Sequence, residues 1–180
     1  MNKTKLVNCF LSGRRKSISK YENQTEELQS KVLQKLIRQA IHTEWGQTHG
    51  FAQVNDYNSF TKTSPINTYE ELKGYIDRMR RGEKDVLWSG KVRWYAKSSG
   101  TTNDKSKFIP VSKECLQDTH YRGGTDAVAL YLGQNPRSRM FDGKALILGG
   151  SHSPNYNLPH SLVGDLSAIL IENVSPFVNH

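Results

Sequence analysis

The sequence has few cysteines and no long apolar run. Its two cysteines, Cys9 and Cys115, are too few and too far apart for a disulfide framework or a four-ligand zinc site. That usage indicates a reducing compartment, and we expect a cytoplasmic protein. No apolar stretch approaches the roughly 20 residues that a membrane-spanning helix needs. Disulfide-rich secreted domains and integral membrane proteins are therefore excluded, and we expect no membrane span.

Charge of one sign is missing at each end of the chain. The 180 residues carry 25 Lys and Arg against 17 Asp and Glu, a net charge of +8, yet residues 1–20 contain no acid and residues 145–180 contain no Lys or Arg. A basic surplus of this kind can bind nucleic acid or an anionic lipid surface. It can also provide local positive potential for a phosphate-bearing ligand, or belong to a solvated helix face. Composition alone leaves these alternatives open.

Helical patterns dominate the first 82 residues. A stripe of apolar residues at spacings of three and four predicts one helix from Asn23 to near Gly46. Residues 46–66 are rich in Gly, Asn, Thr and Ser and predict an ordered connection that Pro65 closes. A second helix is expected to open at Thr68, because Glu71 completes a capping box. It should end at Gly82, with Arg78, Arg80 and Arg81 favourably placed at its negative dipole end.

Short strands are expected after residue 82. Apolar runs predict strands over 86–88, 92–96, 107–111 and, as a buried strand, 144–148. A third helix should run from Ser112 to about Leu132. Its inward-facing residues are expected to be Leu116, His120, Val128 and Tyr131. Helices that alternate with apolar strands indicate the α/β class.

One loop has the composition of a phosphate site. Residues 97–110 read KSSGTTNDKSKFIP and lie between two predicted strands. Glycine lets backbone amides turn toward an anion, hydroxyl groups add donors, and lysine supplies charge. The second glycine of a Walker A loop is missing, and no G-x-G-x-x-G pattern occurs. A plain Ser- and Thr-rich hairpin loop is the alternative explanation.

The same residues resemble a known motif. Ser98-Ser99-Gly100-Thr101-Thr102 followed by Lys107 resembles the first nucleotide-binding motif of the adenylate-forming enzymes. The phrases TEWGQTHGF, SPINTYEELKGYIDRMRRGEKDVLW and GDLSAIL are similar to the Gretchen Hagen family of auxin-responsive acyl-acid amido synthetases, in its bacterial branch. The similarity extends from about residue 20 to the end of the chain.

This resemblance implies an ATP-dependent ligase. A carboxylic acid would be adenylated by ATP with Mg²⁺, and an amine, usually an amino acid, would then take the acyl group. Ser98, Ser99, Gly100, Thr101 and Thr102 would surround the β- and γ-phosphates. The catalytic role would fall to Lys107, which would offset charge on the departing pyrophosphate. Asp104 stands where many relatives have glycine and would weaken anion affinity unless a lysine offsets it.

The sequence also supports predictions about the other parts of the catalytic site. Arg122, on the third helix, is a weak candidate for the acyl carboxylate, although a surface or packing role is also open. No His and Cys spacing indicates a metal site on the protein. The family's later motifs and its C-terminal lid are not found in residues 111–180. We therefore expect residues 1–180 to be the N-terminal fragment of a single large adenylating domain, mainly helical over 1–82 and α/β over 83–180 with the phosphate loop at 98–107.

That expectation limits the activity predicted for this chain. Apolar residues reach its C-terminus, as expected of a chain cut from something longer. Alone, it should neither form an adenylate nor hold ATP tightly. Two competing classes remain, a basic module that binds nucleic acid or an anionic surface and a non-catalytic truncated product. The ligase hypothesis expects acid and amine substrates and no nucleic-acid partner.

Overall fold

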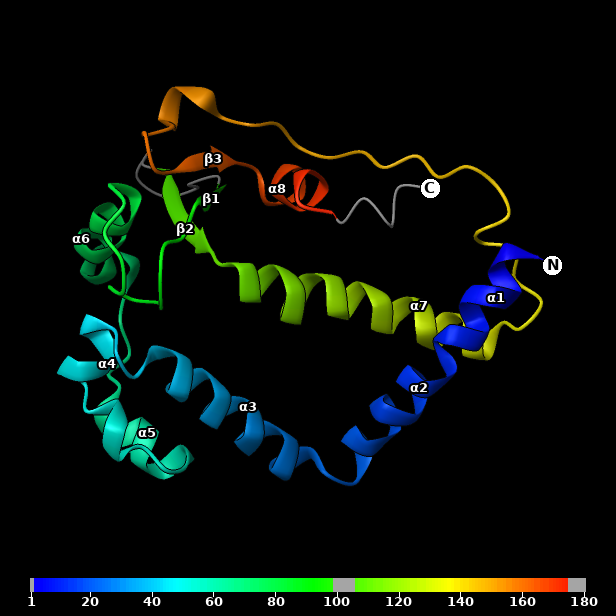
Figure 1. The fold of residues 1–180 in the computed structure, drawn as a ribbon, viewed down its shortest axis with the longest axis horizontal. Coiled ribbons are helices and arrows are strands. Elements are labelled where there is room, and N and C mark those ends of the chain that lie inside the picture. Colours follow the sequence, from blue (N-terminus) through cyan, green and yellow to red (C-terminus); the bar gives the residue numbers. More distant parts are fainter. Residues whose placement is uncertain (1, 99–105, 175–180) are drawn as a thin grey trace. The chain divides into compact units, whose positions relative to one another are not determined.

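The computed structural model describes residues 2–98 and 106–174 (Figure 1). The chain divides into two compact units, each assembled from separate stretches of sequence. Unit 1 comprises Met1–Gln29 and Glu114–Leu148, and unit 2 comprises Ser30–Lys113 and Gly149–His180. The predicted phosphate loop therefore belongs to unit 2, whereas Arg122 belongs to unit 1.

Unit 1 is helical. Its elements are α1 (Lys3–Phe10), α2 (Ser12–Ile18), a 3-10 turn (Ser19–Glu22), the start of α3 (Thr25–Ala40), a π-helical turn (Cys115–Tyr121) and α7 (Arg122–Gln134). The Asn2 side chain caps α1 by accepting from the backbone N–H of Thr4 at 2.8 Å. Arg14 of α2 makes a bidentate ion pair with Asp126 of α7, with N–O distances of 2.5 and 2.7 Å. This pair fastens α2 to α7.

Two expectations for this unit are corrected. Within the predicted third helix Leu116 is buried, but Tyr131 is 47% exposed, because Ala129 and Leu132 occupy the buried face of α7. Residues 144–148 form no strand. Their apolar side chains are among the most exposed of the described residues, since no described strand pairs with them: Leu146 (84%), Ile147 (74%) and Leu148 (85%).

Unit 2 combines helices with a small sheet. Its helices are α3, α4 (Glu44–Thr48), a 3-10 turn (Phe51–Gln53), α5 (Tyr57–Thr63), α6 (Tyr69–Arg80), a second 3-10 turn (Pro154–Tyr156) and α8 (Leu166–Glu172). Within the ordered connection predicted over 46–66, the chain forms the helix α5, which the composition did not indicate. A capping box at Asp56, whose carboxylate accepts from the N–H of Ser59, starts that helix.

The predicted helix from Asn23 to Gly46 is interrupted. Thr43 ends α3 by donating its hydroxyl to the carbonyl of Ala40 at 2.7 Å, and it starts α4 by accepting from the N–H of Gly46. A Cβ at Gly46 would collide with the Ala40 carbonyl oxygen, so the close approach of the two helices requires glycine. The apolar stripe continues across the break, which is why periodicity does not reveal it.

Helix α6 begins as predicted. Thr68 is its N-cap, and the Glu71 carboxylate returns the bond to the Thr68 N–H at 2.6 Å. This arrangement makes Tyr69 the first helical residue. Gly82, at φ +95°, ends the helical segment in a conformation that favours glycine.

Residues 86–88 form no strand, although Val86 is buried and Leu87 and Trp88 are partly buried. The carbonyls of Asp85 and Val86 accept from the N–H groups of Glu44 and Trp45, at 2.8 and 3.0 Å, and so satisfy the start of α4. Asp85 adopts a φ of +56°, and its carboxylate closes a tight loop onto the N–H of Gly90. The strand prediction is wrong here, because the carbonyls cap a helix while Val86 packs in the core at 1% exposure.

The sheet has three strands in the order β2-β1-β3. Strand β1 (Trp94–Ser98) pairs antiparallel with β2 (Lys107–Val111) and parallel with β3 (Leu162–Gly164). Helix α6 packs beside this sheet (Figure 1). The core between them is formed by Ile76, Met79, Val86, Val92, Tyr95 and Val163. Burial of this core fixes the β1–β2 hairpin against α6.

A second core cluster lies among the helices of unit 2. It contains Ile37, Ala40, Phe51 and Val54. Trp88 packs against both clusters and so connects α3 with the sheet side of the unit. The prediction of strand 107–111 is confirmed, and the strand predicted over 92–96 is displaced by two residues to β1.

Candidate phosphate-binding hairpin

The antiparallel hairpin brings the two ends of the predicted phosphate loop together. Ser98, the last residue of β1, lies directly opposite Lys107, the first residue of β2. Paired residues in such a ladder have Cα atoms about 4.5–5.5 Å apart. The remaining predicted loop residues lie outside the described residues: Ser99, Gly100, Thr101, Thr102 and Asp104.

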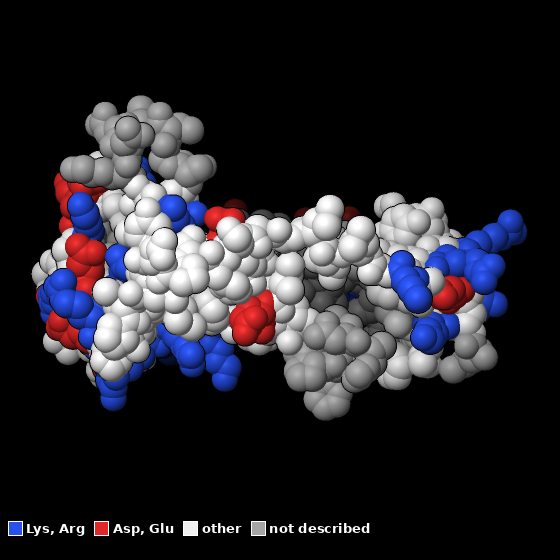
Figure 2. Space-filling view, turned by 90° about the horizontal axis from the view of Figure 1, so that it is seen from above, with Lys and Arg blue, Asp and Glu red and all other residues white. Residues whose placement is uncertain are grey.

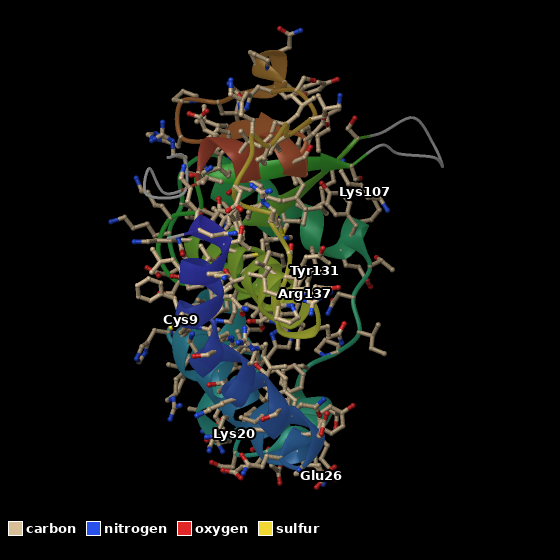
Figure 3. The ribbon with its side chains drawn as sticks, turned by 90° about the vertical axis from the view of Figure 1, so that its right-hand side faces the viewer. Cys9, Lys20, Glu26, Lys107, Tyr131 and Arg137 are labelled. Carbon is tan, nitrogen blue, oxygen red and sulfur yellow. The ribbon has the colours of Figure 1, made fainter. Side chains whose placement is uncertain are left out.

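Lysines near the hairpin end lie over aromatic rings. The Lys107 ammonium is 5.5 Å from the centre of the Tyr69 ring. Figure 3 labels Lys107, the first residue of β2. The Lys97 ammonium, one residue before Ser98, is 4.4 Å from the Tyr156 ring. A ring face attracts a cation without neutralising its charge. A ring contact of this kind leaves each ammonium group able to pair with an anion as well.

Arg80 adds a third cation, and this one is buried. Its side chain is 9% exposed, its guanidinium lies 3.9 Å from the centre of the Phe108 ring, and Nη2 donates to the Tyr156 carbonyl at 2.6 Å. Its Nε is buried and has no described hydrogen-bond partner. Sequence reasoning placed Arg80 at the helix end and missed this contact, because nothing local distinguishes it from Arg78 or Arg81.

The three cations near the hairpin have no ion-pair partner among the described residues. Among residues 2–98 and 106–174, no Asp or Glu forms an ion pair with Arg80, Lys97 or Lys107. Arg78, on the same helix, is instead paired with Glu44 and Glu83. The hairpin thus has positive potential that its described neighbours leave uncompensated, which favours binding of an anion.

A tyrosine of β1 that lies near Arg80 has a raised pKa. Tyr95 of β1 is fully buried, and burial raises its pKa to about 12, with the positive charge of Arg80 acting in the opposite direction. Its hydroxyl has no hydrogen-bond partner among the described residues, and the same holds for the hydroxyl of Ser161. At neutral pH Tyr95 is protonated and can donate a hydrogen bond, but it cannot act as a base.

A separate hollow lies at the other end of β1. It has a volume of about 270 Å³ and is lined by Trp94, His152, Asn157, Leu162, Val163 and Glu172. The rings of Trp94 and His152 are 5.6 Å apart. Since Trp94 begins β1 and Ser98 ends it, this hollow does not belong to the phosphate loop.

Arg122 occupies a different setting. It is the first residue of α7, in unit 1, with a side chain 54% exposed and an Nη2 3.4 Å from the Asp118 carboxylate one turn earlier. The hairpin residues belong to unit 2, so the structure describes Arg122 only within its own unit.

The structure describes residues 2–98 and 106–174. That part of the chain contains no group of three or more His, Cys, Asp or Glu side chains arranged to hold a metal ion. It also contains no helix of the length and apolar character needed to cross a bilayer. Mg²⁺ is usually held by one or two carboxylates together with substrate phosphates. The described hairpin fits phosphate, and it offers Mg²⁺ no carboxylate of its own.

Comparison with known proteins identifies related enzymes. Jasmonoyl--L-amino acid synthetase JAR6 of Nicotiana attenuata is 32% identical over 108 residues, which are 58% of this chain and 19% of that protein. Indole-3-acetic acid-amido synthetase GH3.15 of Arabidopsis thaliana is 32% identical over 93 residues, 51% of this chain and 16% of that protein. The chain therefore spans less than a fifth of the length of these curated relatives. Both are plant proteins, and they give no support to the predicted bacterial branch.

A solved structure supports the same relationship. The GH3.15 acyl acid amido synthetase structure superposes with a TM-score of 0.70 at 25% identity, covering 87% of this chain and 28% of that one. This match confirms the predicted fold class, an N-terminal part with helices first and an incomplete sheet after them. The GH3 family N-terminal domain matches residues 14–174. The chain therefore belongs to the GH3 family, which its segments TEWGQTHGF and GDLSAIL resemble.

Proposed function

We propose that this chain carries the nucleotide-phosphate-binding part of an ATP-dependent acyl-acid amido synthetase. The observation that carries the proposal is the β1–β2 hairpin, where Lys97, Lys107 and Arg80 contact aromatic rings and have no described carboxylate partner. Triphosphate needs compensating charge and hydrogen-bond donors. The motif Ser98 to Thr102 supplies hydroxyl and amide donors between those strands.

The proposed reaction has two steps. A carboxylate oxygen bonds to the α-phosphorus of ATP as the α–β anhydride bond breaks, giving an acyl-adenylate and pyrophosphate. An amine nitrogen then bonds to the acyl carbon, the acyl–oxygen bond breaks, AMP leaves and the nitrogen loses a proton. Lys107 is assigned to the charge of the departing pyrophosphate, and Ser98, Ser99, Gly100, Thr101 and Thr102 to the phosphates. Mg²⁺ would arrive with the nucleotide.

The substrate class follows from the relatives. They are named as a jasmonoyl--L-amino acid synthetase, an indole-3-acetic acid-amido synthetase and a 4-substituted benzoates-glutamate ligase. We propose that the complete enzyme joins a carboxylic acid to an amino acid. Contact between Arg122 and the acyl carboxylate stays a prediction, as does assignment to the bacterial branch. A cytoplasmic location is proposed because the chain has only two cysteines, Cys9 and Cys115, too few for a disulfide framework.

Residues 1–180 by themselves should be inactive. They correspond to 28% of the solved GH3.15 chain, and the family's later motifs are not found in them. We propose that this chain alone binds ATP weakly and forms no adenylate. We further propose that the rest of the catalytic site belongs to the portion of the fold that the relatives have in addition.

Two measurements test the proposal. In the 180-residue chain, MgATP should perturb the amide NMR signals of Ser98 and Lys107, with pyrophosphate exchange at background. Joining residues 1–174 to the remaining portion of JAR6 should restore carboxylate-dependent ATP–pyrophosphate exchange. Lys107→Ala should abolish that exchange, whereas Lys113→Ala, an exposed lysine beyond β2, should not. Unchanged signals at saturating MgATP, or exchange by the isolated chain, would contradict the corresponding part of the proposal.

A basic module that binds nucleic acid is the second candidate. On the face shown in Figure 2, Lys and Arg side chains are interspersed with Asp and Glu and do not form a surface of one sign. That distribution favours the ligase. Nucleic-acid affinity that falls steeply with salt would instead support the binding module.

A further inference from the structure

Tyr69 contacts two consecutive residues of the candidate hairpin. Its hydroxyl accepts a hydrogen bond from the backbone N–H of Phe108 at 2.9 Å, and its ring lies beneath the Lys107 ammonium at 5.5 Å. Tyr69 is held in turn by the capping box of Thr68 and Glu71, which makes it the first residue of α6. The start of α6 therefore determines both where β2 begins and where the Lys107 side chain lies.

Arg80 contacts the same strand from the other end of α6. Its guanidinium lies over the Phe108 ring at 3.9 Å, and its Nη2 donates to the carbonyl of Tyr156 at 2.6 Å. The rings of Phe108 and Tyr156 are 5.7 Å apart, and Lys97 lies over the second of them. Arg80 thereby joins α6, β2 and the turn that supports Lys97.

Burying a guanidinium is energetically less favourable than burying an apolar side chain of the same volume. Removing a cation from water is unfavourable unless other groups compensate, and apolar side chains of similar volume often stabilise a fold better than buried charges do. Arg80 is 9% exposed, leaves Nε without a described partner and has no described carboxylate. Packing alone therefore does not account for it. Its contacts converge on Phe108, the residue next to Lys107.

We propose that Tyr69 and Arg80 are positioning residues that hold Phe108, and through it the Lys107 ammonium, in place for a phosphate-bearing ligand. This inference rests on the proposed phosphate-binding role of the hairpin. Neither residue touches the ligand. Tyr69 fixes the start of β2 by a hydrogen bond and shields one side of Lys107, while Arg80 fixes the Phe108 ring.

The first test compares two Tyr→Phe substitutions on one helix. Tyr69→Phe keeps the ring under Lys107 but removes the acceptor for the Phe108 N–H. Tyr75→Phe is the matched control, because its ring packs against Trp45 and no hydrogen bond of its hydroxyl is described. Tyr69→Phe should speed hydrogen exchange at the Phe108 amide about three- to tenfold, the loss of one hydrogen bond. It should also move the ring-current-shifted signals of the Lys107 side chain.

Ligand affinity provides the functional readout. With inorganic tripolyphosphate as the probe, Tyr69→Phe should weaken binding about three- to tenfold. Tyr75→Phe should bind as the parent chain does. Arg80→Lys keeps the charge but loses the planar group over Phe108, so it should also weaken binding and shift the Lys107 signals. Arg81→Met, an exposed neighbour, should change neither.

The outcomes separate this inference from the proposed function. If the parent chain does not bind tripolyphosphate, the phosphate-binding role fails, yet the Phe108 exchange rate and the Lys107 signals still test positioning. If those two readouts are the same in Tyr69→Phe as in the parent, positioning by Tyr69 is overturned even when tripolyphosphate binds. Should Arg80→Lys unfold, Tyr69→Phe decides. Lost stability with unchanged Lys107 signals and affinity would make both residues purely structural.

Discussion

Two arginines of α6, Arg78 and Arg80, lie in opposite electrostatic surroundings. Arg78 is paired with two carboxylates, Glu44 and Glu83, at the exposed side of the helix. Arg80, two residues later, lies buried over Phe108 with no described acid. A helix turn of 3.6 residues puts the two side chains on different sides, so adjacent sequence carries different electrostatics. The region around Arg78 is neutralised by its own carboxylates, whereas the region around Arg80 has no described acid to neutralise it, and we propose that its charge serves a ligand.

The largest effect is expected when one cation is removed from the β1–β2 hairpin, where no described carboxylate pairs with the lysines. Lys107→Met removes one ammonium from the hairpin and should weaken tripolyphosphate binding at least tenfold, since a charge-assisted bond contributes about 1.5–3 kcal/mol. Calorimetric titration at fixed ionic strength measures this. Lys97→Met should weaken binding less, because Lys97 precedes the motif. Equal and negligible losses would show that the hairpin charge has no ligand.

The next effect concerns the neutralised pair of unit 1. The hydrogen bond from Arg14 holds the pKa of Asp126 below its ordinary value, although burial acts in the opposite direction. A lowered native pKa stabilises the fold above the unfolded pKa of about 3.9, and this stability is lost as the pH falls through the native pKa. Asp126→Asn should reduce the free energy of unfolding at neutral pH by about 1–2 kcal/mol.

Urea unfolding at several pH values measures both parts of this prediction. The parent should lose stability on acidification from pH 5 to pH 2, a window set by the ordinary carboxyl pKa. Asp126→Asn should show a shallower loss over the same window. A parallel pH dependence in the two proteins would mean that this pair contributes nothing to acid sensitivity.

A smaller effect sharpens the comparison by changing helix stability alone. Gly74 lies inside α6, and a Cβ there would meet no atom within 4 Å. Gly74→Ala should therefore stabilise the fold by up to about 1 kcal/mol, since glycine is a poor helix former. Tripolyphosphate affinity should not change. An altered affinity would mean that the flexibility of α6, and not the contacts of Tyr69 and Arg80, governs the hairpin.

The smallest effect is expected at Arg78. Hydrogen bonds from Arg78 lower the pKa of Glu44 and of Glu83, but both carboxylates are solvent-exposed. Exposed ion pairs contribute little because water and salt screen them. Glu83→Gln should lower the thermal midpoint only slightly, and added salt should erase the difference. A large change that persists in high salt would place Arg78 with the buried cations.

Local sequence patterns predicted some of the secondary-structure elements correctly and missed others. The Thr68–Glu71 capping box and strand 107–111 were predictable because short-range rules govern them. The break at Thr43 was not, because the apolar stripe runs through it. The strand expected at 86–88 failed for a different reason, since its carbonyls cap α4 at a distance in sequence.

In the candidate site, too, some residues could be predicted from the sequence and others could not. Ser98 and Lys107 were predictable from a contiguous motif, and the register of β1 and β2 places them opposite each other. Tyr69, Arg80 and Tyr156 were not, because their contacts with Lys97, Lys107 and Phe108 depend on how separate elements pack. Within the described residues, the sequence therefore indicated the end of the hairpin that we propose to face a ligand, and it did not indicate the residues that support that end.

The capping box at Thr68 has a consequence beyond helix stability. Two exposed side-chain bonds fix which residue is the first of α6, and that choice sets the direction in which the Tyr69 ring leaves the helix. A shift of one residue in the helix start would rotate that ring by about 100° and remove it from Lys107. A surface turn far from the loop in sequence thus acts as the reference point from which the position of the lysine is set.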